Sequence, residues 1–265
     1  MRLGLSSFCF RYACRDAQPP MDPLTMMRKA AAMGADLVQY CDNLPLHTLP
    51  QSEIDALIAL SAETGVAIEV GARGLDLPVM ERNIEIGEEA GSKAMRLVLD
   101  EEDTETIAQA LEAILPKLRA AGLGLAIENH GSVPARTLAA MIEALDDPLI
   151  SFCVDMGNNM ILLEYPMDTV VALAPRASQL HIKDVMIERA PIGYHITGRP
   201  LGEGMLDIPA ILRVFGDKLS ELDTMIELWM DPADTLEETL AMERVWIKQS
   251  LEAARAFLAQ QGVNA

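Results

Sequence analysis

The sequence predicts an α/β protein with a single (β/α)8 barrel, and three observations support that prediction. Helical patterns end at a glycine four times, and an apolar, strand-like run follows each of Gly34, Gly65, Gly91 and Gly122. These glycines are spaced by 31, 26 and 31 residues, a period that fits one helix plus one parallel strand. Eight such apolar runs occur in 265 residues, and eight units close a barrel.

The expected strands are short and alternate with helical segments whose starts can be recognised. They are residues 3–8, 37–41, 66–70, 95–99, 123–128, 150–155, 179–183 and 224–228. Asp22 is a capping carboxylate before Pro23, and Ser52 with Asp55 approximates a capping box. Neither a Gly/Ser-rich linker nor a shift in composition divides the chain, so we expect one domain over residues 1–265.

An open, doubly wound sheet is the alternative fold. It normally uses fewer strands and often a glycine-rich phosphate-binding turn, and no G-x-G-x-x-G motif follows a strand here. One connection is unusually long, covering the 22 residues 184–205, which are rich in glycine and proline and lack a clear period. Because long loops in compact domains are usually functional or disordered, this segment is a candidate functional loop.

The acidic charge balance excludes some partners. The chain carries 40 Asp and Glu against 21 Lys and Arg, a formal net charge of −19, which opposes nucleic acid and anionic membranes as main partners. No apolar run approaches the roughly 18 residues that a membrane span needs, and the N-terminus lacks the pattern of a secretion signal. The four cysteines form no C-x-x-C pair. We therefore expect a reduced, cytoplasmic protein.

Four consecutive expected strands each end on a side chain that can bind a metal. These residues are Glu128, Asp155, His181 and Glu227, at intervals of 27, 26 and 46 residues. A single strand-end carboxylate is more often a helix cap or a surface group, but a charge inside an apolar strand is costly unless it is paired or metal-bound. Three carboxylates and one imidazole suit Mn²⁺ or Mg²⁺ best, with Co²⁺ or Zn²⁺ as alternatives.

Three further charged residues interrupt apolar strands. Lys183 lies two residues after His181 and therefore on the same face of its strand, where it could bind a substrate oxygen, unless it points to the surface. Glu69 and Arg96 are candidates for substrate contact. A buried ion pair or a polar layer inside the barrel explains these two residues equally well.

The long connection carries positive charge in a strongly acidic protein. Arg189, His195 and Arg199 would suit a carboxylate or phosphate on the substrate, because arginine binds such groups through two parallel hydrogen bonds. The alternative is a solvated loop in which the two arginines pair with Glu188 and Glu203.

Three more side chains lie next to the expected ligands. Trp229 is two residues past Glu227 and could form a wall of the pocket, although a core tryptophan is equally compatible with its position. His130 and Asn158 are candidate contacts for the ligands or the substrate, with loop capping as the alternative.

With these residues in place, the sequence resembles the xylose isomerase-like barrel superfamily, and within it the sugar phosphate isomerase/epimerase group that includes ketose 3-epimerases. The similar segments are Ile127-Glu128-Asn129-His130, Asp155-Met156-Gly157-Asn158 and His181-Ile182-Lys183-Asp184. The resemblance covers essentially the whole chain. It implies a TIM barrel with a divalent metal, Mn²⁺ before Mg²⁺, Co²⁺ or Zn²⁺, held by Glu128, Asp155, His181 and Glu227.

The resemblance also implies a reaction class. In such enzymes a divalent ion chelates the oxygens of an α-hydroxyketone and stabilises an enediolate, and two glutamates exchange protons on opposite faces. Carried over by position, these catalytic residues are Glu128 and Glu227. The leading expectation is an isomerase or epimerase of a ketose or sugar acid, so the partner is a small sugar or sugar acid. Dimers and tetramers are common in this family, and a homo-oligomer is therefore an open alternative.

Other functions share the scaffold. A lyase, either a decarboxylase of a 3-keto sugar acid or a keto-inositol-type dehydratase, would use the same enolate chemistry, and the cationic loop favours an acidic substrate. An apurinic endonuclease would need more than the four histidines present and a surface that attracts phosphate. The four-residue metal set speaks against a non-catalytic sugar-binding protein.

Overall fold

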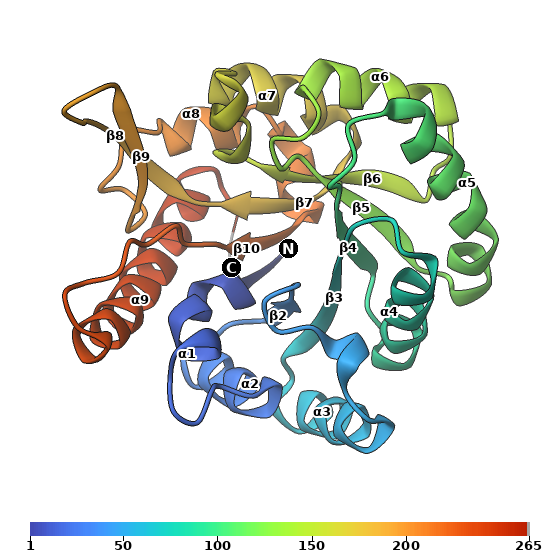
Figure 1. Ribbon diagram of the computed structural model, residues 1–265, viewed down its shortest axis with the longest axis horizontal. Helices are drawn as coiled ribbons and strands as arrows, with labels where there is room; N and C mark the ends of the chain where they lie inside the picture. The colour runs from blue at the N-terminus through green and yellow to red at the C-terminus, as the bar shows by residue number, and fades with distance from the viewer. Residues whose placement is uncertain (264–265) are drawn as a thin grey trace.

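Eight parallel strands surround the centre of the molecule and close into a barrel, as the computed structural model of residues 1–263 shows (Figure 1). Around the barrel the order is β1-β10-β7-β6-β5-β4-β3-β2. The strand bounds are β1 (Arg2–Ser6), β2 (Leu37–Tyr40), β3 (Ala67–Arg73), β4 (Ala94–Val98), β5 (Gly124–Glu128), β6 (Ile150–Asp155), β7 (Ala177–Ile182) and β10 (Asp223–Ile226). The predicted single-domain (β/α)8 barrel is confirmed.

Helices form a ring outside the strands (Figure 1). Their bounds are α1 (Arg11–Arg15), α2 (Pro23–Ala32), α3 (Gln51–Thr64), α4 (Leu77–Ala90), α5 (Thr104–Ala121), α6 (Ala135–Leu145), α7 (Pro166–Leu173), α8 (Ile208–Arg213) and α9 (Leu236–Gln260). Short 3-10 helices are η1 (Ser7–Phe10), η2 (Leu46–Thr48), η3 (Asn158–Leu162), η4 (Ala174–Arg176) and η5 (Gly216–Glu221).

Local signals explain most helix ends. The Asp22 side chain accepts a hydrogen bond from the Thr25 N–H at 2.8 Å, as the sequence predicts for the start of α2. Gly65 ends α3 with a left-handed φ of 74°, which glycine adopts without steric cost. The predicted capping box at Ser52 is wrong: α3 begins earlier, after Pro50, and Ser52 lies within its first turn. The first strand also ends earlier than expected, because Ser6 caps η1.

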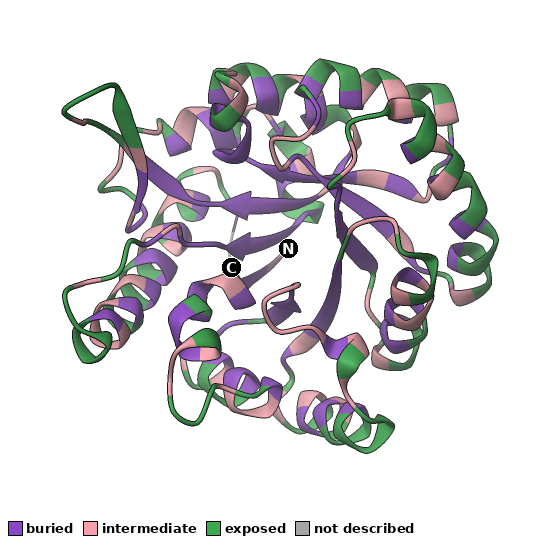
Figure 2. Ribbon diagram, viewed as in Figure 1, coloured by how far each residue is buried: buried purple, intermediate pink, exposed green. Residues whose placement is uncertain are grey.

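The long connection 184–205 contains structure that the sequence did not predict. β8 (Asp184–Arg189) and β9 (Tyr194–Arg199) pair as an antiparallel ribbon that extends beyond the ring of helices (Figure 1). The outer part of this ribbon is exposed, as Figure 2 shows, so no alternation of apolar residues marks its strands. The expectation of an irregular loop is therefore wrong for most of this segment.

Hydrogen bonds at Asp184 and at Gly198 fix the base of the ribbon to the barrel. The buried Asp184 carboxylate accepts hydrogen bonds from the N–H groups of Gly202 (3.0 Å), Gly204 (2.9 Å) and Leu206 (3.2 Å). The N–H of Gly198 donates to the carbonyl of Trp229 at 2.6 Å, and a side chain at residue 198 would collide with that carbonyl. The ribbon therefore starts and ends at fixed positions beside β7 and β10.

The interior of the barrel is packed in layers. The main core lies between strands and helices, whereas Leu37, Ala94, Ala126, Cys153 and Met225 form a separate buried cluster. Three of these side chains precede expected metal ligands by two residues and therefore share their inward face. Below these three ligands the site thus rests on apolar side chains, whereas the buried polar Gln179 precedes the fourth, His181, by two residues. Within residues 1–263, no helix is long and apolar enough to cross a membrane.

Candidate metal centre

The four residues expected as metal ligands meet at one end of the barrel. Glu128 and Asp155 are the last residues of β5 and β6, His181 is near the end of β7, and Glu227 directly follows β10. All four are buried, and one ligand atom from each lies within 4.8 Å of the others. Because parallel strands end at the same face of a barrel, residues up to 99 positions apart in the chain converge at this face.

The imidazole of His181 shows that this cluster can accept a cation. Its Nδ1 lies 3.1 Å from Glu227 Oε2, 3.6 Å from Asp155 Oδ2 and 3.7 Å from Glu128 Oε2. Yet this buried Nδ1 has no hydrogen-bond partner among the described residues. An unpartnered imidazole nitrogen beside three carboxylates is the donor set of a divalent metal ion, so the residues fit such an ion.

Asp155 is fixed in a ligand orientation by backbone contacts. Its Oδ1 accepts hydrogen bonds from the N–H groups of Gly157 and Asn158, both at 2.8 Å, in the turn that follows β6. The Asn129 side chain makes two hydrogen bonds to the Asp155 backbone. Its Oδ1 accepts from the Asp155 N–H at 2.8 Å, and its Nδ2 donates to the Asp155 carbonyl at 2.9 Å. These contacts leave Asp155 Oδ2 directed toward the cluster.

Lys183 adds a buried positive charge to the centre. Its Nζ lies 2.7 Å from Glu227 Oε1 and 2.8 Å from Asp155 Oδ2, and it donates to Asn158 Oδ1 at 3.0 Å. The Trp229 ring lies 4.4 Å from the same Nζ. Burial alone would lower the pKa of Lys183, but the surrounding carboxylates outweigh burial and raise it, so the ammonium stays charged.

Arg96 is the second buried cation at this end. Its Nε donates to Glu128 Oε2, and its Nη1 lies 3.2 Å from Asp42 Oδ1. Asn158 donates to the other oxygen, Glu128 Oε1, at 2.7 Å. Both oxygens of the Glu128 carboxylate are therefore held by donors.

The Glu227 carboxylate is held in its charged form. Burial would raise its pKa, but Lys183 and then His181 outweigh burial and bring the pKa of Glu227 well below its usual value. Ser6 also donates to Glu227 Oε2 at 3.3 Å. A carboxylate in this environment is a strong cation ligand and a weak base.

The other predicted site residues are distributed unevenly. Four of them lie at the cluster: Arg96, Asn158, Lys183 and Trp229. The half-buried His130 lies two residues after the end of β5. Glu69 lies deeper inside the barrel, where Arg2 and Gln179 donate to its two oxygens at 2.9 and 2.7 Å.

The structure does not connect the three basic residues of the ribbon to the metal cluster. Arg199 pairs with Glu188, His195 lies 2.9 Å from Asp231, and Arg189 is exposed. Over residues 1–263 none of the three forms a hydrogen bond or ion pair with the four ligand residues. Their predicted role in substrate binding stays a prediction.

Sequence reasoning missed Gln39, whose Oε1 lies 2.8 Å from His181 Nε2. A polar residue within the otherwise apolar β2 was the available signal. Asp42 and Asn129 gave no comparable signal, because each lies in a polar segment after a strand.

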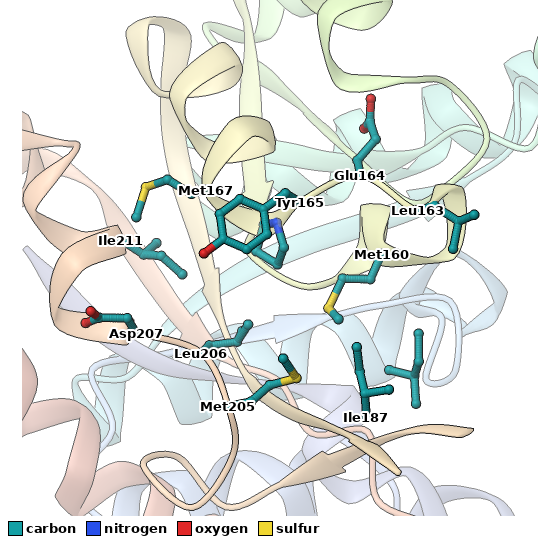
Figure 3. A pocket seen from close by; sticks show the side chains of 12 residues that line it. Met160, Leu163, Glu164, Tyr165, Met167, Ile187, Met205, Leu206, Asp207 and Ile211 are labelled. Carbon is teal, nitrogen blue, oxygen red and sulfur yellow. The ribbon is translucent and has the colours of Figure 1, made fainter. Parts of the chain in front are cut away.

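A separate pocket lies between η3, the start of α7 and the ribbon (Figure 3). It has a volume of about 330 Å³, and its lining is mostly apolar, with Met160, Tyr165, Ile187 and Met205 around the hollow. None of the four ligand residues lines it. The pocket is therefore distinct from the metal cluster, and its lining suits an apolar group.

Comparison with known proteins defines the family. The model of the xylose isomerase-like TIM barrel family matches residues 27–256, so the chain belongs to that family. The chain is 28% identical over 258 residues to a 3-oxo-isoapionate decarboxylase of Pectobacterium atrosepticum, and the match covers 95% of this chain and 94% of that protein. The family, the buried cluster and this relative define a metal-dependent barrel enzyme that acts on a sugar-related compound.

Solved structures agree on the fold. An IolI protein with a bound zinc atom superposes with a TM-score of 0.74 at 13% identity, covering 98% of this chain and 99% of that chain. A D-psicose 3-epimerase from Clostridium cellulolyticum H10, solved with D-tagatose, has a TM-score of 0.73 at 12% identity, covering 97% and 99%. At such identities the likeness concerns the barrel and not the reaction.

Proposed function

We propose that the protein is a divalent-metal-dependent decarboxylase of a 3-keto sugar acid. The observation that carries this proposal is the buried Lys183 ammonium, 2.7 Å from Glu227 and 2.8 Å from Asp155. The decarboxylase relative at 28% identity supports the same chemistry. The sequence alone favoured an isomerase or epimerase, and the contacts of the two glutamates are the reason to prefer the lyase.

An epimerase needs two glutamates that take and return a proton at carbon. In this chain Arg96 and Asn158 donate to both oxygens of Glu128, and Lys183 contacts Glu227. Glu227 is a poor base, because Lys183 and His181 bring its pKa well below the usual value, and the donors to Glu128 occupy the two oxygens that would have to take a proton. Decarboxylation requires no base at carbon, since the bond to the carboxylate breaks instead of a C–H bond.

The cations of the site suit an acidic substrate. A divalent ion held by the four ligand residues would supply a Lewis acid for the developing negative charge on the substrate oxygens. Lys183 and Arg96 offset the charge of the carboxylates, so an anionic substrate is not repelled from the cluster.

Decarboxylation must replace the lost carboxylate on the substrate carbon by a proton, and Lys183 supplies that proton in this proposal. When the C–C bond to the carboxylate breaks, CO₂ leaves and its electron pair remains on the substrate as an enediolate. Lys183 Nζ then donates a proton to that carbon and recovers one from solvent. Proton transfer by a positioned group typically contributes about 10²–10⁴-fold to the rate.

This proposal is tested by incubating the protein and Mn²⁺ with a panel of ketoses and 3-keto sugar acids. We expect CO₂ release from a 3-keto sugar acid, with one solvent deuterium in the product when the reaction runs in D₂O. Replacing Lys183 by Met should reduce CO₂ release about 10²–10⁴-fold, whereas the exposed Lys248→Met on α9 should leave it unchanged. Epimerised ketose, or dehydrated product, without CO₂ would contradict the proposal.

A further inference from the structure

A line of buried polar side chains runs through the barrel below the metal centre. Arg2 Nη2 donates to Glu69 Oε1 at 2.9 Å, and Gln179 Nε2 donates to Glu69 Oε2 at 2.7 Å. Gln39 Nε2 then donates to Gln179 Oε1 at 3.2 Å, and Gln39 Oε1 lies 2.8 Å from His181 Nε2. Glu69, Gln179, Gln39 and His181 are all at most 1% exposed.

The direction of each hydrogen bond follows from the one before it. A guanidinium only donates, so Arg2 fixes Glu69 as an acceptor. Gln179 must then turn its amide nitrogen toward Glu69 and its oxygen toward Gln39. Gln39 must likewise point its nitrogen at Gln179 and its oxygen at His181. The Gln39 oxygen can only accept, and His181 Nε2 therefore carries the proton.

This order requires the carboxylate form of Glu69. Burial, with the neighbouring Asp223, raises the pKa of Glu69 to about 8, whereas Arg2 and Gln39 favour the carboxylate. Above that pH both oxygens of Glu69 accept, Oε1 from Arg2 and Oε2 from Gln179.

We propose that Gln39 is a positioning residue for the metal, oriented by Glu69 and Gln179. Because Gln39 holds the proton on Nε2 of His181, the neutral imidazole that binds a metal has its lone pair on Nδ1, the nitrogen that faces the three carboxylates. Partners of this kind typically change metal affinity by about 10–100-fold. This role of Gln39 lies in metal binding and is independent of the reaction that the metal serves.

Metal titration tests this role without substrate. Gln39→Met keeps the side-chain length and removes the acceptor, so the Kd for Mn²⁺ by calorimetry should rise about 10–100-fold. Glu69→Met leaves Gln39 in place but frees its amide to rotate, so the Kd should rise by a smaller factor. In the Zn²⁺-loaded protein, a long-range ¹H–¹⁵N spectrum should show His181 protonated only at Nε2, and the Gln39→Met signal should be altered.

Glu243→Met on α9 is the matched control, because it makes the same substitution at another buried glutamate, which accepts from the Tyr12 N–H and contacts neither glutamine. It should leave the Kd for Mn²⁺ within about twofold. The Glu69→Met measurement also decides the question if Gln39→Met does not fold. An unchanged Kd in both Gln39→Met and Glu69→Met, or an equal loss in Glu243→Met, would overturn the proposal. Failure of the decarboxylation assay would leave these results intact.

Discussion

Both ends of the barrel contain buried charges, but only one end is complete without a ligand. At the N-terminal end of the strands, Arg2 pairs with Glu69 and Asp223, and Lys93 lies 3.3 Å from Asp223. We call these four residues the floor cluster. At the opposite end, Glu128, Asp155, His181 and Glu227 lie with Lys183 and Arg96, and we call these six the mouth cluster.

The difference lies in the hydrogen-bond partners. Both carboxylates of the floor cluster contact cations, and its two acids match its two bases in number. In the mouth cluster, three carboxylates face two permanent cations, and His181 Nδ1 has no partner among residues 1–263. A satisfied buried network rigidifies a fold, whereas an unsatisfied one is costly unless a ligand completes it. The floor cluster therefore stabilises the fold, whereas the mouth cluster has the properties of a ligand-binding site.

The largest effect should come from Asp155→Asn in the mouth cluster. Asparagine keeps the Oδ1 that accepts from Gly157 and Asn158 but replaces Oδ2 by an amide nitrogen. We expect an unchanged circular dichroism spectrum, a metal affinity at least about 10²-fold weaker and a turnover at least about 10³-fold lower. Stoichiometric Mn²⁺ in the purified variant at wild-type affinity would contradict the distinction between the two clusters.

Arg2→Met should have its effect on stability instead. Removing the guanidinium leaves Glu69 and Asp223 without their shared partner, and breaking a buried ion pair costs roughly 2–4 kcal/mol where one partner is partly exposed. Urea unfolding should report this loss, while calorimetry should find that the Mn²⁺ affinity falls by no more than in Glu69→Met, because Arg2 reaches the metal site only through Glu69. A large loss of affinity at unchanged stability would reverse the assignment.

Glu243 on α9 is a buried acid outside both clusters, and it lacks a cation at bonding distance in the described structure. Its carboxylate accepts from the Tyr12 N–H at 2.8 Å, and burial raises its pKa to about 7. Because the folded pKa lies above the unfolded value, the charged group lowers the free energy of unfolding as the pH rises from about 4.5 to 7.

Glu243→Gln removes this dependence. Relative to wild type, the variant should gain up to about 3 kcal/mol in the free energy of unfolding between pH 4.5 and pH 8. Urea unfolding at both pH values, compared with wild type, measures the gain. The same difference at both pH values would show that the charge of Glu243 is compensated, as that of Asp223 is in the floor cluster.

The smallest effect should come from the ribbon. Arg189 is exposed, so its attraction for an acidic substrate is screened by solvent and salt. Arg189→Ala should raise KM about two- to threefold at low ionic strength, leave kcat unchanged, and match wild type at 0.5 M salt, where the Debye length is only about 4 Å. A KM increase that persists at high salt would place Arg189 in direct contact with the substrate.

The mouth cluster could be predicted because its signals are local. Each ligand is a polar residue at the end of an apolar run, and parallel strands must bring such ends together. Lys183 followed from its two-residue spacing to His181. The hydrogen-bond partners of Glu69 could not be predicted, because Gln39 and Gln179 come from other strands.

The ribbon escaped prediction for a related reason. Its strands are largely exposed, so they carry no alternating pattern, and its base is fixed by Asp184 through backbone groups about 20 residues away. The cationic residues 189, 195 and 199 suggested a substrate loop, with pairing to Glu188 and Glu203 as the alternative. Arg199 does pair with Glu188, whereas sequence alone could not show that Asp231 lies beside His195.

The anchoring of the ribbon divides it into a base where substitutions are sterically constrained and a tip where they are not. Its base is tied to Asp184 and Trp229, next to Lys183, and tolerates no side chain at Gly198 or Gly204. Its tip, with Ile192 at 96% exposure, is free of such constraints. Substitutions at the tip can therefore alter what approaches the opening of the barrel without displacing the buried residues of the mouth cluster.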